Sequence, residues 1–259
     1  MALNKQSPVP LYYQLVELLK EQIRQGELQH GEQLPPERVL SEHYGISRMT
    51  ARQAISYLVR EGAVVAKHGL GTFVAEPKLT YDALHLLGFT EESMRRGGTV
   101  VSRVLEQQLV TPPARVAEGL RLAPTAKGTK IVRLRLSDET PLLLETTFVP
   151  AALCPGLAEQ DLATHSLYAV MEERWGVRLM HARQALEATI ANDYEAELFG
   201  VAPGTAMILL EGVTYDDQDR PAEYFKAVYR GDRFKFAFES ERGGGAESSG
   251  GPRLSVVLA

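Results

Sequence analysis

The sequence predicts an α+β protein, on two observations. Residues 10–60 show helical periodicity interrupted by short glycine-containing turns, which indicates a helical first part. Residues 102–238 alternate apolar strand-like runs with short helices, which favours helices packed on a mostly antiparallel sheet. With 259 residues, 44% hydrophobic and 24% charged, the chain is long enough for one large or two ordinary globular domains.

The first helix is expected over residues 10–26, and its apolar spacing makes it amphipathic. Its buried face would hold Leu11, Leu15, Leu18, Leu19 and Ile23. A second helix starts at Pro35 and Pro36, since proline lacks only an N–H that the first turn leaves unpaired. It runs to about Tyr44, and Gly45 then permits the backbone angle of a tight turn.

A third helix follows, with Ser47 as its N-cap and Gly62 as its C-cap. Its buried stripe is formed by Ala51, Ala54, Ile55 and Leu58. Arg48, Arg52 and Ser56 are four residues apart and share the opposite face. Short strands at 63–66 and 72–74, with a tip at 67–71, complete a winged helix-turn-helix.

This arrangement favours DNA binding, with the third helix in a major groove about 12 Å wide. Arginines near its N-terminal end can pair with guanine or phosphate, each typically worth about 1–3 kcal/mol. Gly69 would let the wing backbone approach the duplex. A surface helix with solvated arginines beside a plain hairpin is the alternative. Two arginines alone would favour that alternative, but the whole ordered set favours DNA.

Residues 8–74 resemble the DNA-binding domain of the GntR family over its full length. The pattern that carries the resemblance is LP-x-ER-x-L, then G-[IV]-SR-x-T-x-R-x-A, L-x-x-EG and G-x-GTFV. Pro36 departs from it, because the family usually has Ser or Ala there. The resemblance implies DNA contacts by Arg38, Ser47, Arg48, Thr50, Arg52 and Gly69.

The charge and the cysteine content limit which functions other than DNA binding the chain could have. The formal net charge is −5, and residues 1–76 are neutral, so any DNA affinity must come from locally placed charge and be salt-dependent. The single Cys154 excludes a disulfide framework or a Cys-rich metal site within one chain, and no cofactor is expected. Without a signal core or a span of ~20 apolar residues, we expect a cytoplasmic protein, at the nucleoid when bound to DNA.

The domain boundary is placed near Pro77, a natural hinge. We expect a DNA-binding domain at 1–76, a linker at 77–88, a second domain at 89–240 and a flexible Gly/Ser-rich tail at 241–259. The strands expected in the second domain are 102–110, 129–137, 142–150, 179–191, 207–215, 222–229 and, as an edge strand, 234–238. The expected helices are 113–122, 166–175 and 193–199.

Several polar residues interrupt these strands. Arg133 and Arg135 share one face of a strand and could cradle an anion, because a guanidinium matches phosphate with two parallel bonds. The helix start at Ser166, with Tyr168, could add donors. The carboxylates and the phenol that could form hydrogen bonds with sugar hydroxyls belong to Glu145, Glu223 and Tyr229. The alternative is cross-strand salt bridges on a solvated face, which spacing alone favours.

Residues 81–240 resemble the effector-binding domain of the HutC branch of the GntR family, whose fold is similar to that of chorismate lyase. The segments NKQSPVPLYYQ, GISRMTARQA and VYRGDRFKF most resemble regulators of N-acetylglucosamine utilisation in Gram-positive bacteria. The resemblance implies that an amino-sugar 6-phosphate binds here. Its phosphate would meet Phe89, Thr90, Arg133, Arg135, Ser166 and Tyr168, and its sugar Glu145, Glu223 and Tyr229. The match needs a one-residue insertion near residues 160–230, so the position assigned to Ser166 could instead fall on His165.

We therefore expect a homodimeric repressor that reads palindromic double-stranded operator DNA and responds to a sugar phosphate, most simply glucosamine-6-phosphate or N-acetylglucosamine-6-phosphate. A regulator of this type that answers to another phosphorylated sugar or an organic acid is the first alternative. A lyase-like enzyme with Glu145 and Glu223 as acid and base is more distant, since neither a nucleophile elbow nor zinc spacing is present. An architectural DNA binder without a ligand is the third.

Overall fold

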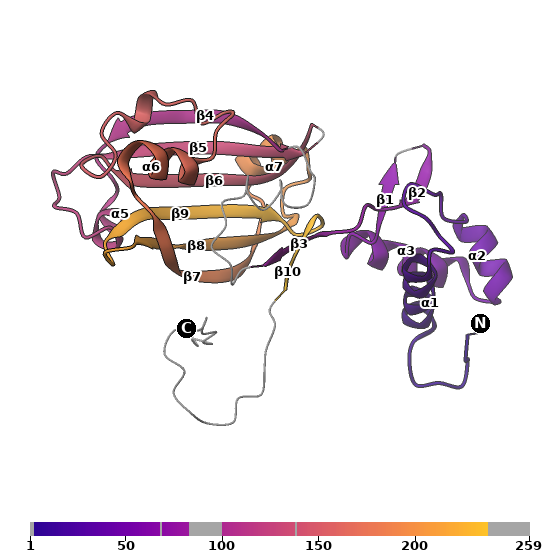
Figure 1. Cartoon of the computed structure of the whole chain (residues 1–259). Coiled ribbons are helices and arrows are strands. Elements are labelled where there is room, and N and C mark those ends of the chain that lie inside the picture. Colours follow the sequence, from indigo (N-terminus) through magenta and orange to yellow (C-terminus); the bar gives the residue numbers. More distant parts are fainter. Residues whose placement is uncertain (1–2, 68, 83–99, 138, 238–259) are drawn as a thin grey trace. The chain divides into compact units, whose positions relative to one another are not determined.

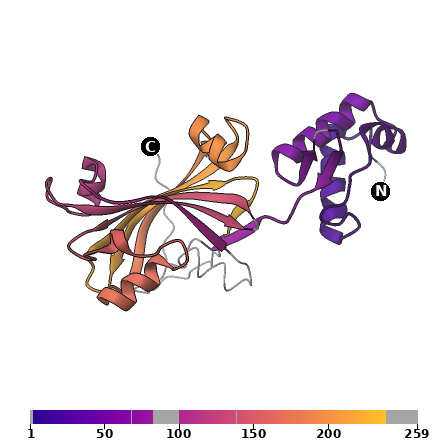
Figure 2. The same ribbon diagram turned by 90° about the horizontal axis from the view of Figure 1, so that it is seen from above.

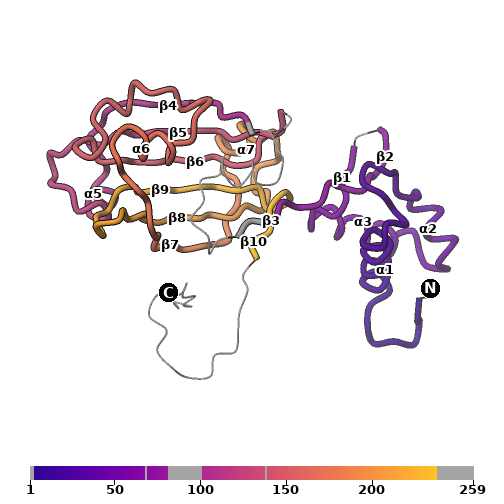
Figure 3. Tube along the Cα trace, in the orientation of Figure 1, coloured from indigo at the N-terminus to yellow at the C-terminus, as the bar shows by residue number. Residues whose placement is uncertain are grey.

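The computed structural model describes residues 3–67, 69–82, 100–137 and 139–237 (Figure 1). The contacts between residues divide the chain into two compact units. One unit comprises Met1–Leu79 together with Arg230–Phe234, and the other comprises Thr80–Tyr229 together with Lys235–Ala259. Figure 3 follows the same path as a tube from the N-terminus to the C-terminus.

The first unit is a winged helix-turn-helix, as the sequence predicts. Its elements are α1 (Leu11–Gln25), α2 (Glu37–Tyr44), α3 (Arg48–Arg60), β1 (Val64–Lys67) and β2 (Gly71–Val74). Gly45 ends α2 with a left-handed φ of 61°, which a side chain would disfavour. Ser47 caps α3, because its hydroxyl accepts the Thr50 N–H at 3.0 Å. The predicted C-cap is shifted by one residue: Glu61 caps α3 in a right-handed conformation, and Gly62 follows at φ 73°.

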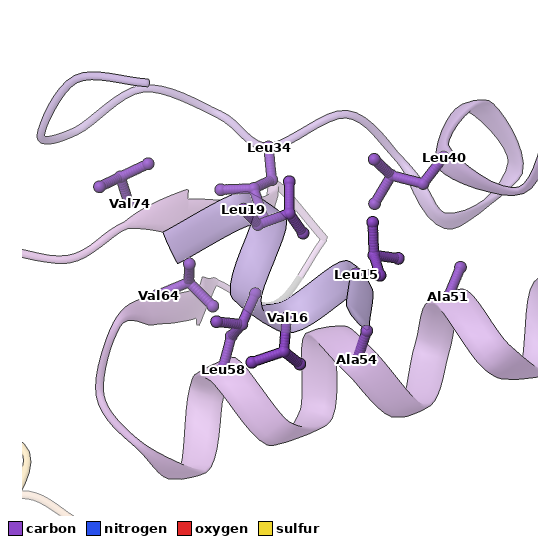
Figure 4. Close-up of a cluster of buried hydrophobic side chains, with 10 residues drawn as sticks. All are labelled: Leu15, Val16, Leu19, Leu34, Leu40, Ala51, Ala54, Leu58, Val64 and Val74. Atoms are coloured by element: carbon purple, nitrogen blue, oxygen red, sulfur yellow. The ribbon is translucent and has the colours of Figure 1, made fainter. Parts of the chain in front are cut away.

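One apolar cluster holds these elements together (Figure 4). Its buried members are Leu15, Val16, Leu19, Leu34, Leu40, Ala51, Ala54, Leu58, Val64 and Val74. The buried face of α1 is narrower than predicted and includes Val16, which the spacing did not single out. Leu11, Leu18 and Ile23 are only half-buried.

The second unit is built on a six-stranded sheet in the order β4-β5-β6-β9-β8-β7. All of the strand pairings resolved residue by residue are antiparallel. The strands are β4 (Val100–Val110), β5 (Gly128–Ser137), β6 (Thr140–Pro150), β7 (Leu179–Ile190), β8 (Ala206–Asp216) and β9 (Pro221–Arg230). The expected α+β class is confirmed.

The last predicted strand was placed wrongly. β10 (Phe234–Ala237) does not form an edge of the large sheet but pairs with β3 (Leu79–Asp82) in a separate two-stranded sheet. The reason lies in the preceding turn: Arg230–Phe234 belongs to the first unit, where Arg233 O accepts the Leu79 N–H at 2.8 Å. Within the described residues, β4 and β7 are the edges of the large sheet.

Helices cover both faces of that sheet, as Figure 2 shows. The helix α6 (Leu167–Trp175) and the short turn η1 (Leu157–Glu159) pack on one face, against Ile131 and Val149. The helices α5 (Ala114–Gly119) and α7 (Asp193–Phe199) lie on the other face. A capping box at Asn192 and Glu195 fixes the start of α7. Among the described helices, none combines the length and apolar character that a membrane crossing requires.

Substitution of Leu58 by Ala should destabilise the first unit by about 2–5 kcal/mol, because the side chain is fully buried and its loss leaves a cavity. Denaturant unfolding followed by far-UV circular dichroism should shift to a lower midpoint. The fluorescence of Trp175, the only tryptophan and part of α6, should keep its transition. Val39→Ala, at a residue 39% exposed on α2, is the control. An unchanged dichroism midpoint in Leu58→Ala would contradict the assignment of this core.

Candidate functional site

A buried arginine pair lies on β5 of the second unit. The Nη2 atoms of Arg133 and Arg135 both donate to Glu145 Oε2, at 2.6 and 2.9 Å. Glu145 is the register partner of Arg133 on β6. Arg135 Nη1 also donates to Ser102 Oγ at 2.5 Å. The two arginine side chains are only 2% and 3% exposed, so the cross-strand salt bridges of the alternative interpretation are present, but its solvated face is wrong.

The pair has more positive charge and more donors than the protein satisfies. One carboxylate faces two guanidinium groups, which leaves one positive charge in a buried place. Within the part of the chain that the structure describes, Arg133 Nε and Nη1 are buried and have no hydrogen-bond partner. An unsatisfied buried donor costs about 1–3 kcal/mol, and more when it is charged. An oxyanion beside Arg133 would satisfy both atoms.

A second polar cluster surrounds Glu223 on β9, whose side chain is 1% exposed. Its Oε2 atom accepts the Tyr168 hydroxyl at 2.8 Å and the Thr214 hydroxyl at 2.9 Å. The Thr147 hydroxyl is 3.4 Å from Oε1. These side chains come from α6, β8 and β6, so the cluster joins the helix to the sheet.

The two carboxyl groups have opposite pKa shifts. Burial alone would raise the pKa of Glu145, but the charges and hydrogen bonds of Arg133 and Arg135 outweigh it and lower that pKa from 4.5 to about 2. Burial and the charge of Glu145 raise the pKa of Glu223 to about 7, against the effect of its hydroxyl donors. Burial, and then Glu223, hold the pKa of Tyr168 well above 10, so its hydroxyl stays a donor.

The other predicted ligand residues have different surroundings. Ser166 is half-buried and caps α6, accepting the Ala169 N–H at 3.4 Å. His165 is 64% exposed, with Nδ1 3.6 Å from Asp161 Oδ2. Tyr229 is buried on β9, and its ring stands edge-on to Phe236 at 5.2 Å between centroids. Phe89 and Thr90 lie outside the described residues.

Sequence reasoning missed Ser102, Thr147 and Thr214, the buried hydroxyls that complete the two clusters. The signal for Thr147 was available, because it lies two residues from Glu145 and so shares its face of the strand. Ser102 could be found only from the register that places it opposite Arg135. Thr214 could be found only from the strand order, which places β8 beside β9.

The described residues include no group of three or more side chains arranged for a metal ion. Cys154 is buried, and burial raises the pKa of its thiol to about 12, which leaves it unreactive.

The predicted DNA-contacting residues lie on the surface of the first unit. Arg48 is exposed at the start of α3, and Ser47 Oγ and Thr50 Oγ1 are 2.8 Å apart. Two further arginines form ion pairs: Arg38 with Glu42 at 3.0 Å and Arg52 with Glu37 at 3.1 Å. Exposed ion pairs contribute about 0–1 kcal/mol, so either arginine can exchange its carboxylate for a phosphate.

At Gly69 the backbone of the wing can lie close to a DNA duplex. This glycine adopts φ 72°, and a Cβ built there would meet nothing within 4 Å. A side chain at this position would therefore be strained by its backbone angle and not by its neighbours.

Comparison with known proteins finds a matching family for each of the two units. The family described as "UTRA domain" matches residues 95–235, and "Bacterial regulatory proteins, gntR family" matches residues 11–74. The chain is 39% identical over 242 residues to the HTH-type transcriptional repressor NagR of Bacillus subtilis, covering 93% of this chain and 99% of that protein. It is 34% identical to the HTH-type transcriptional regulator Rv0792c of Mycobacterium tuberculosis, covering 88% and 85%. The crystal structure of PhnF from Mycobacterium smegmatis matches with a TM-score of 0.61 at 28% identity, covering 89% of this chain and 99% of that one.

The raised pKa of Glu223 predicts a pH dependence of stability. Between pH 4.5 and about 7 the folded state holds this proton and the unfolded state releases it. The contribution of Glu223 is therefore fully present below pH 4.5 and is lost as the pH rises through about 7. We expect Glu223→Gln to remove this part of the profile in denaturant titrations from pH 5 to 8. Parallel profiles for the two proteins would contradict the assignment.

Proposed function

Because this chain belongs to the gntR family of bacterial regulatory proteins, with a UTRA domain as its second part, we propose that it represses genes for amino-sugar uptake and catabolism. As a member of that family it is a DNA-binding transcription regulator and not an enzyme. The proposed effector is an amino-sugar 6-phosphate, either glucosamine-6-phosphate or N-acetylglucosamine-6-phosphate. When this effector binds, the repressor releases its operator. The protein acts in the cytoplasm.

The unsatisfied guanidinium of Arg133 carries the proposal. Nε and Nη1 are buried donors without a described partner, on a group that already shares Glu145 with Arg135. A phosphate monoester carries about −1.5 to −2 charges near neutral pH and three acceptor oxygens. It can accept two parallel bonds from the guanidinium and neutralise the remaining charge. Ser166 and Tyr168, with Phe89 and Thr90 from outside the described residues, are the proposed additional phosphate contacts.

The sugar half of the ligand would meet the carboxyl groups. Glu145 stays ionised, since its pKa is about 2, and can accept hydrogen bonds. Glu223 has a pKa of about 7 and can act as donor or acceptor near neutral pH. Tyr229 is buried on the same strand as Glu223. Hydroxyl and amino groups of a hexosamine suit such a mixed set.

The chain path supports coupling between the ligand and the DNA. β9 carries Glu223 and Tyr229 and ends at Arg230, where the segment Arg230–Phe234 joins the first unit. There, Lys78 Nζ donates to Gly231 O at 2.8 Å, and a Cβ on Gly62, just after α3, would lie 2.9 Å from Asp232 O. The segment that continues β9 therefore lies beside the residue that follows α3. A coupling of about 1–3 kcal/mol is typical of such allostery.

The proposed assembly is a homodimer that binds a palindromic operator. Two winged helix-turn-helix units, one from each copy, would place their α3 helices in successive major grooves. In each half-site, Arg38, Ser47, Arg48, Thr50 and Arg52 would contact DNA, with Gly69 from the wing. A different phosphorylated sugar or an organic acid remains the second candidate for the effector, because Arg133 and Arg135 would accept any of these anions.

A thermal-shift screen of sugars and their phosphates should separate these candidates. A ligand at 100 times its Kd stabilises the folded state by about 2.7 kcal/mol. We expect stabilisation by glucosamine-6-phosphate or N-acetylglucosamine-6-phosphate, and none by the unphosphorylated sugars. Stabilisation by a different phosphate or an organic acid alone would replace the proposed effector. No response to any anion would remove the ligand-site proposal.

Two arginine substitutions should separate sensing from DNA binding. Arg133→Ala should abolish release of the operator by the sugar phosphate and spare operator binding, because the buried donors are lost but α3 is untouched. Arg48→Ala should weaken operator binding and spare the thermal shift. Arg178→Ala, at an exposed arginine paired with Glu172, is the matched control and should change neither. Loss of both activities in both variants would show that the division of tasks is wrong.

A further inference from the structure

The outward face of α3 has an apolar side chain at its centre. Ala51, Ala54 and Leu58 are completely buried and define the inner face of the helix. At 3.6 residues per turn, Met49 lies nearly opposite that face, and Gln53 lies one turn further along. Met49 is 67% exposed, although methionine is usually a core residue, and Gln53 is also exposed.

These two residues occupy open positions of the family pattern. The segment G-[IV]-SR-x-T-x-R-x-A fixes Ser47, Arg48, Thr50 and Arg52, and leaves 49, 51 and 53 free. Residue 51 is the buried Ala51 and cannot reach DNA. The fixed residues supply contacts that every protein with this pattern can make. Residues 49 and 53 are the exposed open positions in the first two turns of α3, beside Arg48 and Arg52, whereas Ser56 and Arg60 are exposed open positions nearer its C-terminal end.

We propose that Met49 and Gln53 determine which base sequence this protein binds. Met49 packs on the C5-methyl group of a thymine in the major groove, and Gln53 makes two hydrogen bonds to N6 and N7 of an adenine. The unbranched thioether of methionine adapts its shape to such a methyl group. The residues are four apart, about 6 Å along the helix, so their contacts fall on A·T pairs within about two steps.

The inference depends on DNA binding by α3 and is independent of the effector. A solitary exposed apolar residue is ordinary on a protein surface. Met49 differs because it lies at the centre of a face whose other members, Arg52, Gln53 and Ser56, are exposed and polar. In the major groove, an apolar side chain at that centre discriminates the one base that carries a methyl group.

The test begins with selection of binding sites by the full-length chain from a random double-stranded library. Each thymine of the selected site is then replaced by uracil, which removes only the methyl group. Wild-type affinity should fall about three- to fivefold at one thymine per half-site, the amount expected for one buried methyl group. Met49→Ala should lose this thymine-to-uracil difference, whereas Met49→Leu, which keeps the apolar contact, should retain it.

Met180→Ala is the matched control, because Met180 is 61% exposed but lies on β7 of the second unit. It should behave as the wild type. Gln53→Ala should relax the preference at one A·T pair by about tenfold and leave the salt dependence of binding unchanged, since no phosphate contact is removed. If Met49→Ala keeps the wild-type thymine-to-uracil ratio and Gln53→Ala selects the wild-type site, the assignment is overturned. If the wild-type chain selects no site at all, DNA binding by α3 is contradicted, and with it the base contacts of Met49 and Gln53.

Discussion

The sharing of one carboxylate by two buried guanidinium groups is the interaction on which the second unit depends. Glu145 accepts hydrogen bonds from both Arg133 and Arg135, and both arginines are almost fully shielded from water. Removing charges from water costs several kcal/mol per ion, and one carboxylate compensates two cations only in part. The pair therefore carries positive charge that Glu145 compensates only in part, and Nε and Nη1 of Arg133 are buried without a hydrogen-bond partner in the described residues.

The same buried region holds two carboxyl groups in different states, and their neighbours explain the difference. Glu145 faces guanidinium groups and stays ionised. Burial and the charge of Glu145 raise the pKa of Glu223 to about 7, although the hydroxyls of Tyr168 and Thr214 donate to it and lower that pKa. Ionising Glu223 would place a second negative charge near Glu145. This polarity is the reason that the proposed effector has an anionic end and a hydroxylated end.

The sequence predicted what local chemistry decides. Ser47, Gly45 and the apolar spacing of α3 act within a few residues. The cap and the turn appear where the pattern placed them, and of the predicted stripe Ala51, Ala54 and Leu58 are buried, whereas Ile55 is half-buried. The shared face of Arg133 and Arg135 also followed from alternation along one strand. Their burial did not follow, because α6 and η1 cover that face from a distant part of the chain. Nor did the pairing of β10 with β3, which depends on the path of Arg230–Phe234.

Arginine is used in two environments, and this difference separates the two tasks of the chain. Arg38 and Arg52 are about 60% exposed beside their glutamates, so water and salt screen those pairs and a phosphate can displace them at little cost. Arg133 is shielded from both water and salt, so only a ligand that enters the site can reach it. Salt should therefore weaken operator binding strongly and effector binding weakly. Under the proposed function, the exposed arginines exchange counterions during DNA binding, whereas the buried guanidinium of Arg133 is kept for the effector.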